Sequence, residues 1–142
     1  MKFVLDNSIA MRWLLNDRDA RTQDHARKIL TLLIDGGTAI VPNLWALEAA
    51  NVILKEMKKG NVTQADASQF IALLGELDIQ PDNQTHAHAL RDTLNLAKQY
   101  GLSSYDAAYL ELALRKGIEI ATVDKELGEA ASKAGAIRVL MN

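Results

Sequence analysis

The sequence predicts an α/β fold, a three-layer sandwich in which helices flank a central, mostly parallel sheet. Short apolar runs alternate along the chain with longer segments of helical periodicity, and this alternation is typical of a parallel sheet wrapped by helices. Neither a Pro/Gly/Ser-rich linker nor an internal repeat divides the 142 residues. Because this is the usual length of one compact domain, we expect residues 1–142 to form a single domain.

Apolar periodicity and turn residues set the element boundaries in the first half of the chain. A buried strand begins the chain and a helix follows it directly. The next helix is amphipathic and ends at Gly36-Gly37, Pro42 closes the second strand, and Gly60 ends a long helix. Thr63 is the expected N-cap of the helix after it. The predicted elements are strand 2–5, helix 8–15, helix 20–34, strand 38–41, helix 44–59 and helix 63–77.

The second half continues the alternation. A short strand is expected just before Pro81, and glycines end two helices, at Gly101 and Gly117. The predicted elements are strand 78–80, helix 85–100, helix 104–116, strand 118–123, helix 125–134 and strand 137–140. Sheets of this kind bind ligands beyond the carboxyl ends of their strands, so residues that directly follow strands are the first candidates for a site.

Composition limits the classes of function. About half of the residues are apolar, which is enough for a substantial core, and the absence of cysteine excludes disulfides and thiolate metal sites. The apolar start is too short for a signal peptide, and no apolar run approaches the ~20 residues of a membrane span, so we expect a cytoplasmic protein without membrane contact. The formal charge of −2 gives no indication of nucleic-acid binding.

Two acids directly follow predicted strands. Asp6 follows the first strand, and Asp124 follows the strand near the end of the chain. Each also suits a helix N-cap, but Asn7 or Ser8 can cap the first helix equally well, which leaves Asp6 free. Thr122 lies two residues before Asp124 and therefore shares its face at the end of the strand.

Glu48 interrupts an otherwise apolar helix. Within residues 44–54 only Glu48 and Asn51 are polar, and a helix that is apolar on nearly every side is expected to be buried. A buried, unpaired carboxylate is costly, so Glu48 should neutralise or find a cation. Asn51 shares its face, and Lys55 continues the stripe. The alternative is a narrow stripe that faces water.

Asp106 begins a predicted helix. Ser103 and Asp106 have the spacing of a capping box, which would fix Asp106 in the first helical turn, where an anion is stabilised. If the four acids converge, their like charges repel and their pKa values must rise unless a cation enters. Ligands made of oxygen alone favour a hard ion, Mg²⁺ or Mn²⁺.

These motifs resemble, in order and spacing, those of the PIN-domain nucleases, specifically the VapC-type toxins of type II toxin–antitoxin systems. The resemblance covers essentially the whole chain. It is carried by Val4-Leu5-Asp6-Asn7-Ser8, Pro42 with Glu48-Ala49-Ala50-Asn51, Leu102-Ser103-Ser104-Tyr105-Asp106-Ala107-Ala108-Tyr109 and Ala121-Thr122-Val123-Asp124. Asn7 departs from the pattern, since many members have a small residue or threonine there.

The resemblance implies a PIN-like sandwich and a Mg²⁺- or Mn²⁺-dependent endoribonuclease that hydrolyses RNA phosphodiester bonds with a metal-activated water. Asp6, Glu48, Asp106 and Asp124 match the family's catalytic acids, with Ser8 and Thr122 as supporting hydroxyls. Asn51, on the same helix face as Glu48, is the third candidate supporting residue. The metal would be held by Asp6 and Asp106, with Asp124 and Glu48 completing the site directly or through water. A cognate antitoxin and a homodimer are the implied partners.

Four basic residues are candidates for RNA phosphate contacts, although ordinary surface charge explains each of them equally: Arg12, Lys55, Arg91 and Arg115. One rival hypothesis is a non-catalytic PIN-like module that binds RNA or protein, against which the complete set of acids argues. A second is a phosphoacceptor receiver domain. That design pairs adjacent acids after its first strand, whereas here Asn7 and Ser8 follow Asp6.

Overall fold

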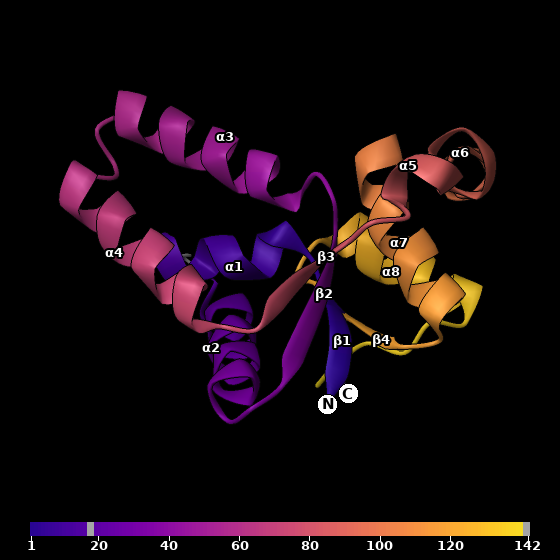
Figure 1. Ribbon diagram of the computed structural model, residues 1–142, viewed down its shortest axis with the longest axis horizontal. Coiled ribbons are helices and arrows are strands. Elements are labelled where there is room, and N and C mark those ends of the chain that lie inside the picture. Colours follow the sequence, from indigo (N-terminus) through magenta and orange to yellow (C-terminus); the bar gives the residue numbers. More distant parts are fainter. Residues whose placement is uncertain (17–18, 141–142) are drawn as a thin grey trace.

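The computed structural model describes residues 1–16 and 19–140, and it confirms the predicted α/β sandwich (Figure 1). Four strands form one sheet in the order β3-β2-β1-β4, and every neighbouring pair is parallel. They are β1 (Lys2–Leu5), β2 (Thr38–Pro42), β3 (Ile79–Asp82) and β4 (Glu119–Ala121). The central strand β1 pairs through Val4 with Ile40 of β2 and with Ile120 of β4.

Helices cover both faces of the sheet. Figure 1 shows α1 to α4 on one side and α5 to α8 on the other, with α3 and α4 forming a hairpin that extends away from the sheet. The helices are α1 (Asn7–Leu14), α2 (Ala20–Ile34), α3 (Trp45–Lys58), α4 (Gln64–Glu76), α5 (Thr85–His88), α6 (Leu94–Tyr100), α7 (Ser104–Lys116) and α8 (Lys125–Ala134), with a π-helical turn η1 (Ala89–Thr93) between α5 and α6. No helix in the described residues is long and apolar enough to cross a membrane.

The core lies where the central strand meets α7. Phe3, Val4 and Leu5 have no exposed surface, because β1 has a strand on each edge and helices on each face. On α7, every residue from Ala107 to Ala113 is buried. The backbone N–H of Asp6 donates to the Ala121 carbonyl at 2.9 Å, which extends the β1–β4 pairing by one step. Asp6 is therefore placed by the sheet itself.

Four predicted elements differ clearly from the observed ones. The strand predicted at 118–123 is shorter, Glu119–Ala121, so Asp124 does not follow it directly as expected. β3 runs through Pro81 instead of ending before it; proline is tolerated because β3 is an edge strand. The strand expected at 137–140 is wrong, since only an isolated bridge between Ile120 and Arg138 forms there. The helix expected at 85–100 is helical throughout but includes the π-helical turn.

An ion-paired triad joins the edge of the sheet to α7. The Arg115 guanidinium donates to both carboxylate oxygens of Asp82, at the end of β3, and through Nε to Glu111 at 2.8 and 3.1 Å. Both carboxylates are buried. Burial alone would raise the pKa of Asp82, but the hydrogen bonds from Arg115 and from the Gln84 backbone outweigh it and lower that pKa. Arg115, one of the candidate RNA contacts, is thus committed to a structural pair.

Replacing Arg115 with methionine should lower the free energy of unfolding by about 3–5 kcal/mol at pH 7, because two buried carboxylates lose their counter-charge. The lowered pKa of Asp82 means that its pairing stabilises the fold above about pH 4 and is lost as pH falls through the folded pKa. The difference in free energy of unfolding between the parent and Arg115→Met, measured by urea denaturation, should therefore become smaller below about pH 4. The matched control is Arg27→Met, which removes an exposed pair with Asp24 and should cost under ~1 kcal/mol. Equal losses in the two variants would contradict this role for Arg115.

Candidate active site

Asp6 is the N-cap residue of α1, but its side chain makes no capping hydrogen bond, and its carboxylate accepts from two hydroxyls instead. The Ser8 hydroxyl donates to Oδ2 at 2.6 Å and the Thr122 hydroxyl donates to the same oxygen at 2.7 Å. Ser8 and Thr122 are in turn fixed by the backbone N–H groups of Val123 and Asp124, which donate to their oxygens. The predicted supporting hydroxyls therefore hold Asp6 across the ends of β1 and β4.

The Asp6 carboxylate is buried and carries an electrostatic cost. Only 5% of the residue is exposed, and burial is the main reason that its pKa is raised to about 6. The two hydroxyl hydrogen bonds oppose that rise, whereas the negative charges of Asp124 and Glu48 add to it. The structure thus brings at least three of the four predicted acids within electrostatic reach of one another.

Asp106 joins the same cluster from the first turn of α7. The Ser103 hydroxyl accepts from its backbone N–H at 3.1 Å, but the reciprocal bond of the expected capping box is not present, and the Asp106 side chain makes no hydrogen bond among the described residues. Burial raises its pKa to about 6, and the charges of Asp6, Asp124 and Glu126 contribute to that rise. The helix start fixes the Asp106 backbone and leaves its carboxylate to face the other acids.

Glu48 lies on a helix that is less buried than expected. α3 buries Trp45, Ala49 and Ile53 but exposes Leu47 and Leu54, so the prediction of an almost entirely buried helix is wrong. Its apolar face in fact lies partly at the surface of the monomer, and two acids of the helix, Glu48 and Glu56, are partly buried.

The Glu48 carboxylate is half-buried and is held by a residue that the sequence analysis did not single out. The Tyr109 hydroxyl, on α7, donates to Glu48 Oε1 at 2.5 Å. Burial raises the pKa of Glu48, as does the charge of Asp106, while the hydrogen bond from Tyr109 lowers it. Burial also raises the pKa of Tyr109, so this phenol stays protonated and remains a donor. No local pattern pairs residues from two helices so far apart in sequence.

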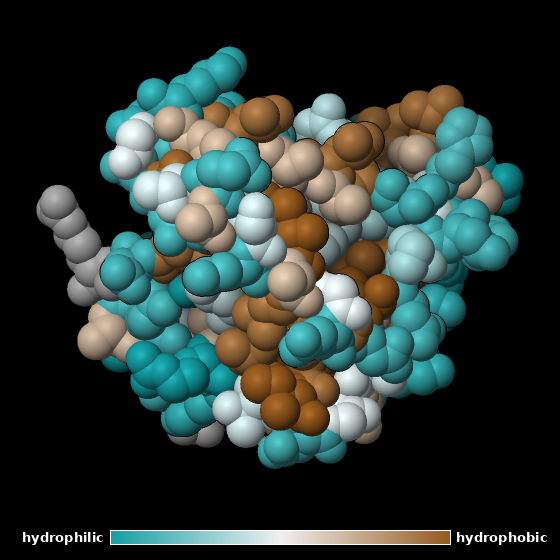
Figure 2. Space-filling view, turned by 60° about the vertical axis from the view of Figure 1, so that its left-hand side comes forward, coloured by the Kyte–Doolittle hydropathy of each residue, from teal (hydrophilic) through white to brown (hydrophobic). Residues whose placement is uncertain are grey.

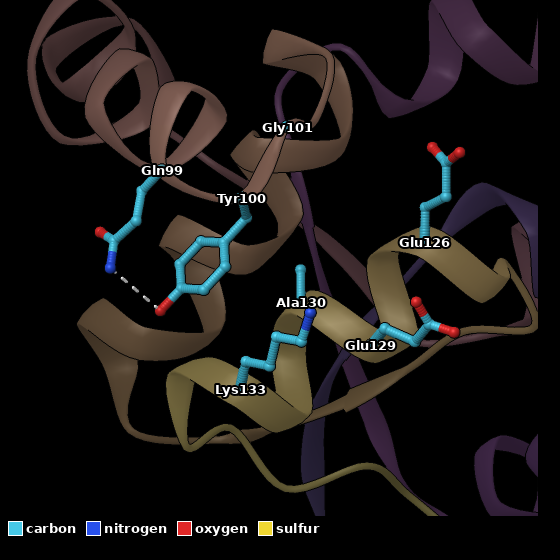
Figure 3. A pocket seen from close by; sticks show the side chains of 7 residues that line it. All are labelled: Gln99, Tyr100, Gly101, Glu126, Glu129, Ala130 and Lys133. Carbon is cyan, nitrogen blue, oxygen red and sulfur yellow. Dashed lines mark hydrogen bonds between the residues drawn. The ribbon is translucent and has the colours of Figure 1, made fainter.

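Asp124 is the N-cap of α8, as predicted. Its Oδ1 accepts from the Leu127 backbone N–H at 2.8 Å, and it follows β4 by three residues. Glu126, two residues further on, is a fifth acid that repels Asp106 and was missed by the sequence analysis. Figure 3 shows the Glu126 side chain projecting from the first turn of α8 at the rim of a pocket that Gln99, Tyr100 and Glu129 also line.

Among the described residues, no hydrogen bond joins Asn51 or the remaining candidate RNA contacts to the four acids. Asn51 is exposed on α3 and forms no side-chain hydrogen bond among the described residues, and Lys55 is exposed one turn further along. Arg91 is exposed on η1, and Arg12 lies in the last turn of α1. Their contacts with RNA stay predictions.

The chemistry of the four acids suits a hard divalent cation. They offer only carboxylate oxygens, and their mutual repulsion, expressed in the raised pKa values of Asp6 and Asp106, would be relieved by positive charge. As the side chains lie, however, no three acids or histidines among the described residues are grouped closely enough to hold a metal ion. The carboxylates would have to turn inward, and Asp106 is free of side-chain bonds that would prevent this.

Comparisons with known proteins show the family and the fold of the chain. Residues 3–133 match the family described as the PIN domain. The chain is 30% identical to Ribonuclease VapC3 of Pyrobaculum aerophilum over 91% of this chain and 94% of that protein, and 34% identical to Exonuclease VapC9 of the same organism over 68% of each. The solved structure of VapBC2 from Rickettsia felis, bound to a DNA fragment from their promoter, is 16% identical with a TM-score of 0.64 and covers 97% of both chains. At that identity the last match shows the fold alone.

The buried charge of Asp6 should destabilise the protein at neutral pH when no divalent ion is present. Its pKa is 3.8 unperturbed and about 6 in the fold, so the folded state retains a proton that the unfolded state releases between about pH 4 and 6, and stability falls as pH rises through that window. A shift of this size corresponds to about 3 kcal/mol. Asp6→Asn should therefore be about 2–3 kcal/mol more stable than the parent at pH 7.5, by urea denaturation in EDTA.

That advantage should shrink as pH falls from 6 to 4, because the parent carboxyl becomes neutral there. Asp35→Asn, at the exposed end of α2, is the control and should stay within about 0.5 kcal/mol of the parent throughout. An Asp6→Asn protein that is less stable than the parent at pH 7.5 would show that the ionised Asp6 carboxylate does not destabilise the folded protein.

Proposed function

Because the chain belongs to the PIN-domain family, we propose that it is a VapC-type toxin, a ribonuclease that hydrolyses RNA phosphodiester bonds at the cluster formed by Asp6, Glu48, Asp106 and Asp124. The observation that carries this proposal is the complete set of acids at the carboxyl edge of the sheet, two of them with a pKa raised to about 6. Groups of this kind are typical of sites that do acid–base or metal chemistry. A relative at 30% identity is named as a ribonuclease.

The proposed cofactor is Mg²⁺ or Mn²⁺. Asp6, Asp106 and Asp124 would hold the ion, with Glu48 completing the site directly or through water. Such an ion supplies a water nucleophile near neutral pH and offsets charge on the phosphate. The role of the protein is to hold oxygen ligands in place at the ends of the strands. For Asp6, the Ser8 and Thr122 hydroxyls do this by donating to Oδ2, so Oδ1 is left without a hydrogen bond among the described residues.

Glu48 is the group proposed to take the proton of the attacking water. Its Oε1 accepts from Tyr109, and its Oε2 accepts no hydrogen bond among the described residues. Burial raises the pKa of the carboxyl and so makes it a better base than an exposed glutamate. Tyr109 acts through Glu48 and is a positioning residue.

The intact acids also weigh against a non-catalytic PIN-like binding module. In such a module nothing requires four carboxylates to be kept together against their repulsion. The proposal is for internal cleavage of RNA, as in an endoribonuclease. One relative is named as an exonuclease, so the two modes are to be separated with a circular RNA, which only an endonuclease can cut.

A cognate antitoxin and a second copy of the chain are the proposed protein partners. α3 leaves Leu47 and Leu54 exposed, and Leu90 and Tyr105 are exposed on η1 and α7. Figure 2, in which the α3–α4 side of the molecule is turned forward, shows a band of hydrophobic surface down the middle of the view. Apolar surface of this kind is typical of protein interaction sites and is available to either partner.

Asp106→Asn should lower the rate of RNA cleavage by roughly 100-fold or more, because it removes one charge from the site that is to hold the ion. The measurement is the initial rate on a circular RNA in Mg²⁺ or Mn²⁺, with EDTA expected to abolish parental activity. Asp35→Asn is the matched control and should cut at the parental rate. Parental cleavage by Asp106→Asn, or undiminished cleavage in EDTA, would contradict the proposal.

Tyr109→Phe should lower kcat by about 10-fold and shift the acid limb of the pH–rate profile to higher pH, because the lost hydrogen bond is one that lowers the pKa of Glu48. Tyr105→Phe, exposed on the same helix, controls for loss of a phenol and should leave the profile in place. A Tyr109→Phe protein with reduced kcat but an unmoved acid limb would mean that the tyrosine does not act through Glu48.

A further inference from the structure

A cavity adjoins the acid cluster at Thr122, whose hydroxyl donates to Asp6. It lies between α2 and the start of α8, has a volume of about 690 Å³, and is lined by Thr122 and Val123 at one end. Its other walls carry four basic side chains, Arg21, Lys28, Lys125 and Arg138, as well as three acids, Asp19, Asp24 and Glu129. Two of the acids are already engaged: Asp24 pairs with Lys28 at 3.1 Å, and Asp19 accepts from the Arg21 backbone as the N-cap of α2. The same pairs engage two of the basic side chains, Lys28 with Asp24 and Arg21 with Asp19 at 4.0 Å, which leaves Lys125 and Arg138 against Glu129, a net charge of one positive unit.

Arg138 is the distinctive residue of this cavity. Its guanidinium lies flat against Gly128 of α8, since a Cβ built on that glycine would come within 2.6 Å of Arg138 Cζ and 2.7 Å of one terminal nitrogen. Arg138 Nε is buried and has no hydrogen-bond acceptor, and the side chain forms no ion pair with any described residue. A buried Nε–H without an acceptor is an unusual arrangement, because buried polar groups are nearly always satisfied.

The position of Arg138 links it to the acids. It forms a parallel bridge with Ile120 of β4, two residues before Thr122, and Thr122 donates to Asp6. Thr122 therefore both lines the cavity and contacts the acid cluster. The pocket in Figure 3, on the far side of α8, offers two acids, Glu126 and Glu129, against one lysine, and so is unsuited to an anion.

We infer that the cavity between α2 and α8 is a subsite for the RNA backbone, in which Arg138 binds a phosphate next to the one that is cleaved. The inference rests on the proposed ribonuclease function and adds a substrate-binding residue to it. The planar guanidinium presents paired donors that match two phosphate oxygens. Lys125, exposed at the start of α8, adds positive charge at the mouth of the cavity.

Two variants test the subsite by different routes. Arg138→Gln removes the charge. Gly128→Ala keeps the charge but places a methyl group where the guanidinium now lies, and it should fold because alanine is favoured over glycine within a helix. Arg27→Gln is the matched control: it removes one charge from an exposed position on α2 that does not line the cavity, and Asp24 keeps its pairing with Lys28.

The first measurement is the Kd of a 20-nucleotide single-stranded RNA without divalent ions, so that nothing is cut, at several salt concentrations. Arg138→Gln and Gly128→Ala should each weaken binding by roughly 10-fold, and Arg138→Gln should reduce the slope of log K against log salt by about one contact. Arg27→Gln should bind within about 2-fold of the parent. Unchanged binding by either cavity variant, or equal weakening by Arg27→Gln, overturns the inference.

The second measurement separates this inference from the proposed function. In Mg²⁺ or Mn²⁺ the KM for RNA should rise about 10-fold in Arg138→Gln while kcat stays within about 3-fold of the parent. A fall in kcat with unchanged KM overturns the subsite assignment. If the parent binds this RNA through Arg138 but does not cut it under any condition, the ribonuclease proposal fails while the phosphate-binding cavity stands.

Discussion

The site depends on one constraint, a carboxylate placed at the end of the most buried strand. β1 is enclosed by strands on both edges and by helices on both faces, so a charge at its carboxyl end is withdrawn from water. The hydroxyls of Ser8 and Thr122 satisfy one oxygen of Asp6 but bring no positive charge, and the neighbouring acids add repulsion. Hydrogen bonds thus fix the carboxylate without neutralising it, and only a cation or a proton can relieve the remaining cost.

The rest of the fold keeps the other acids opposite Asp6. α7 carries both Asp106 and Tyr109, and its position is set by a fully buried middle section and by the Arg115 pair that ties it to the end of β3. The hydrogen bond from Tyr109 then fixes the Glu48 side chain relative to α7. Glu48 belongs to α3, a helix with an exposed side that carries Leu47 and Leu54. Charge repulsion tends to spread the cluster, and the packing of α7 opposes it.

The sequence predicts this site well where local rules apply. Asp6 and Asp124 follow from the ends of apolar strands, and Asp106 follows from the start of a helix, because those positions depend only on near neighbours along the chain. Glu48 was identified for a partly mistaken reason, since α3 is not enclosed and exposes Leu47 and Leu54. The apolar pattern could not distinguish a helix buried in the monomer from one with an apolar face at the surface. The prediction of a strand at 137–140 was wrong for a similar reason, because this apolar segment forms only a single bridge to β4.

Tertiary placement also answers the objection raised by net charge. A formal charge of −2 argues against a nucleic-acid binder only if charge is spread evenly, and here four of the 18 acidic residues are gathered in one cluster. An RNA strand that approached those acids alone would be repelled. A guanidinium held beside them, on the far side of Thr122, offers the strand a phosphate contact without neutralising the carboxylates that must hold a cation. Arg138 can fill that role because Gly128 leaves room for it. Nine residues separate the two in the sequence, so neither periodicity nor a local motif could have predicted the contact.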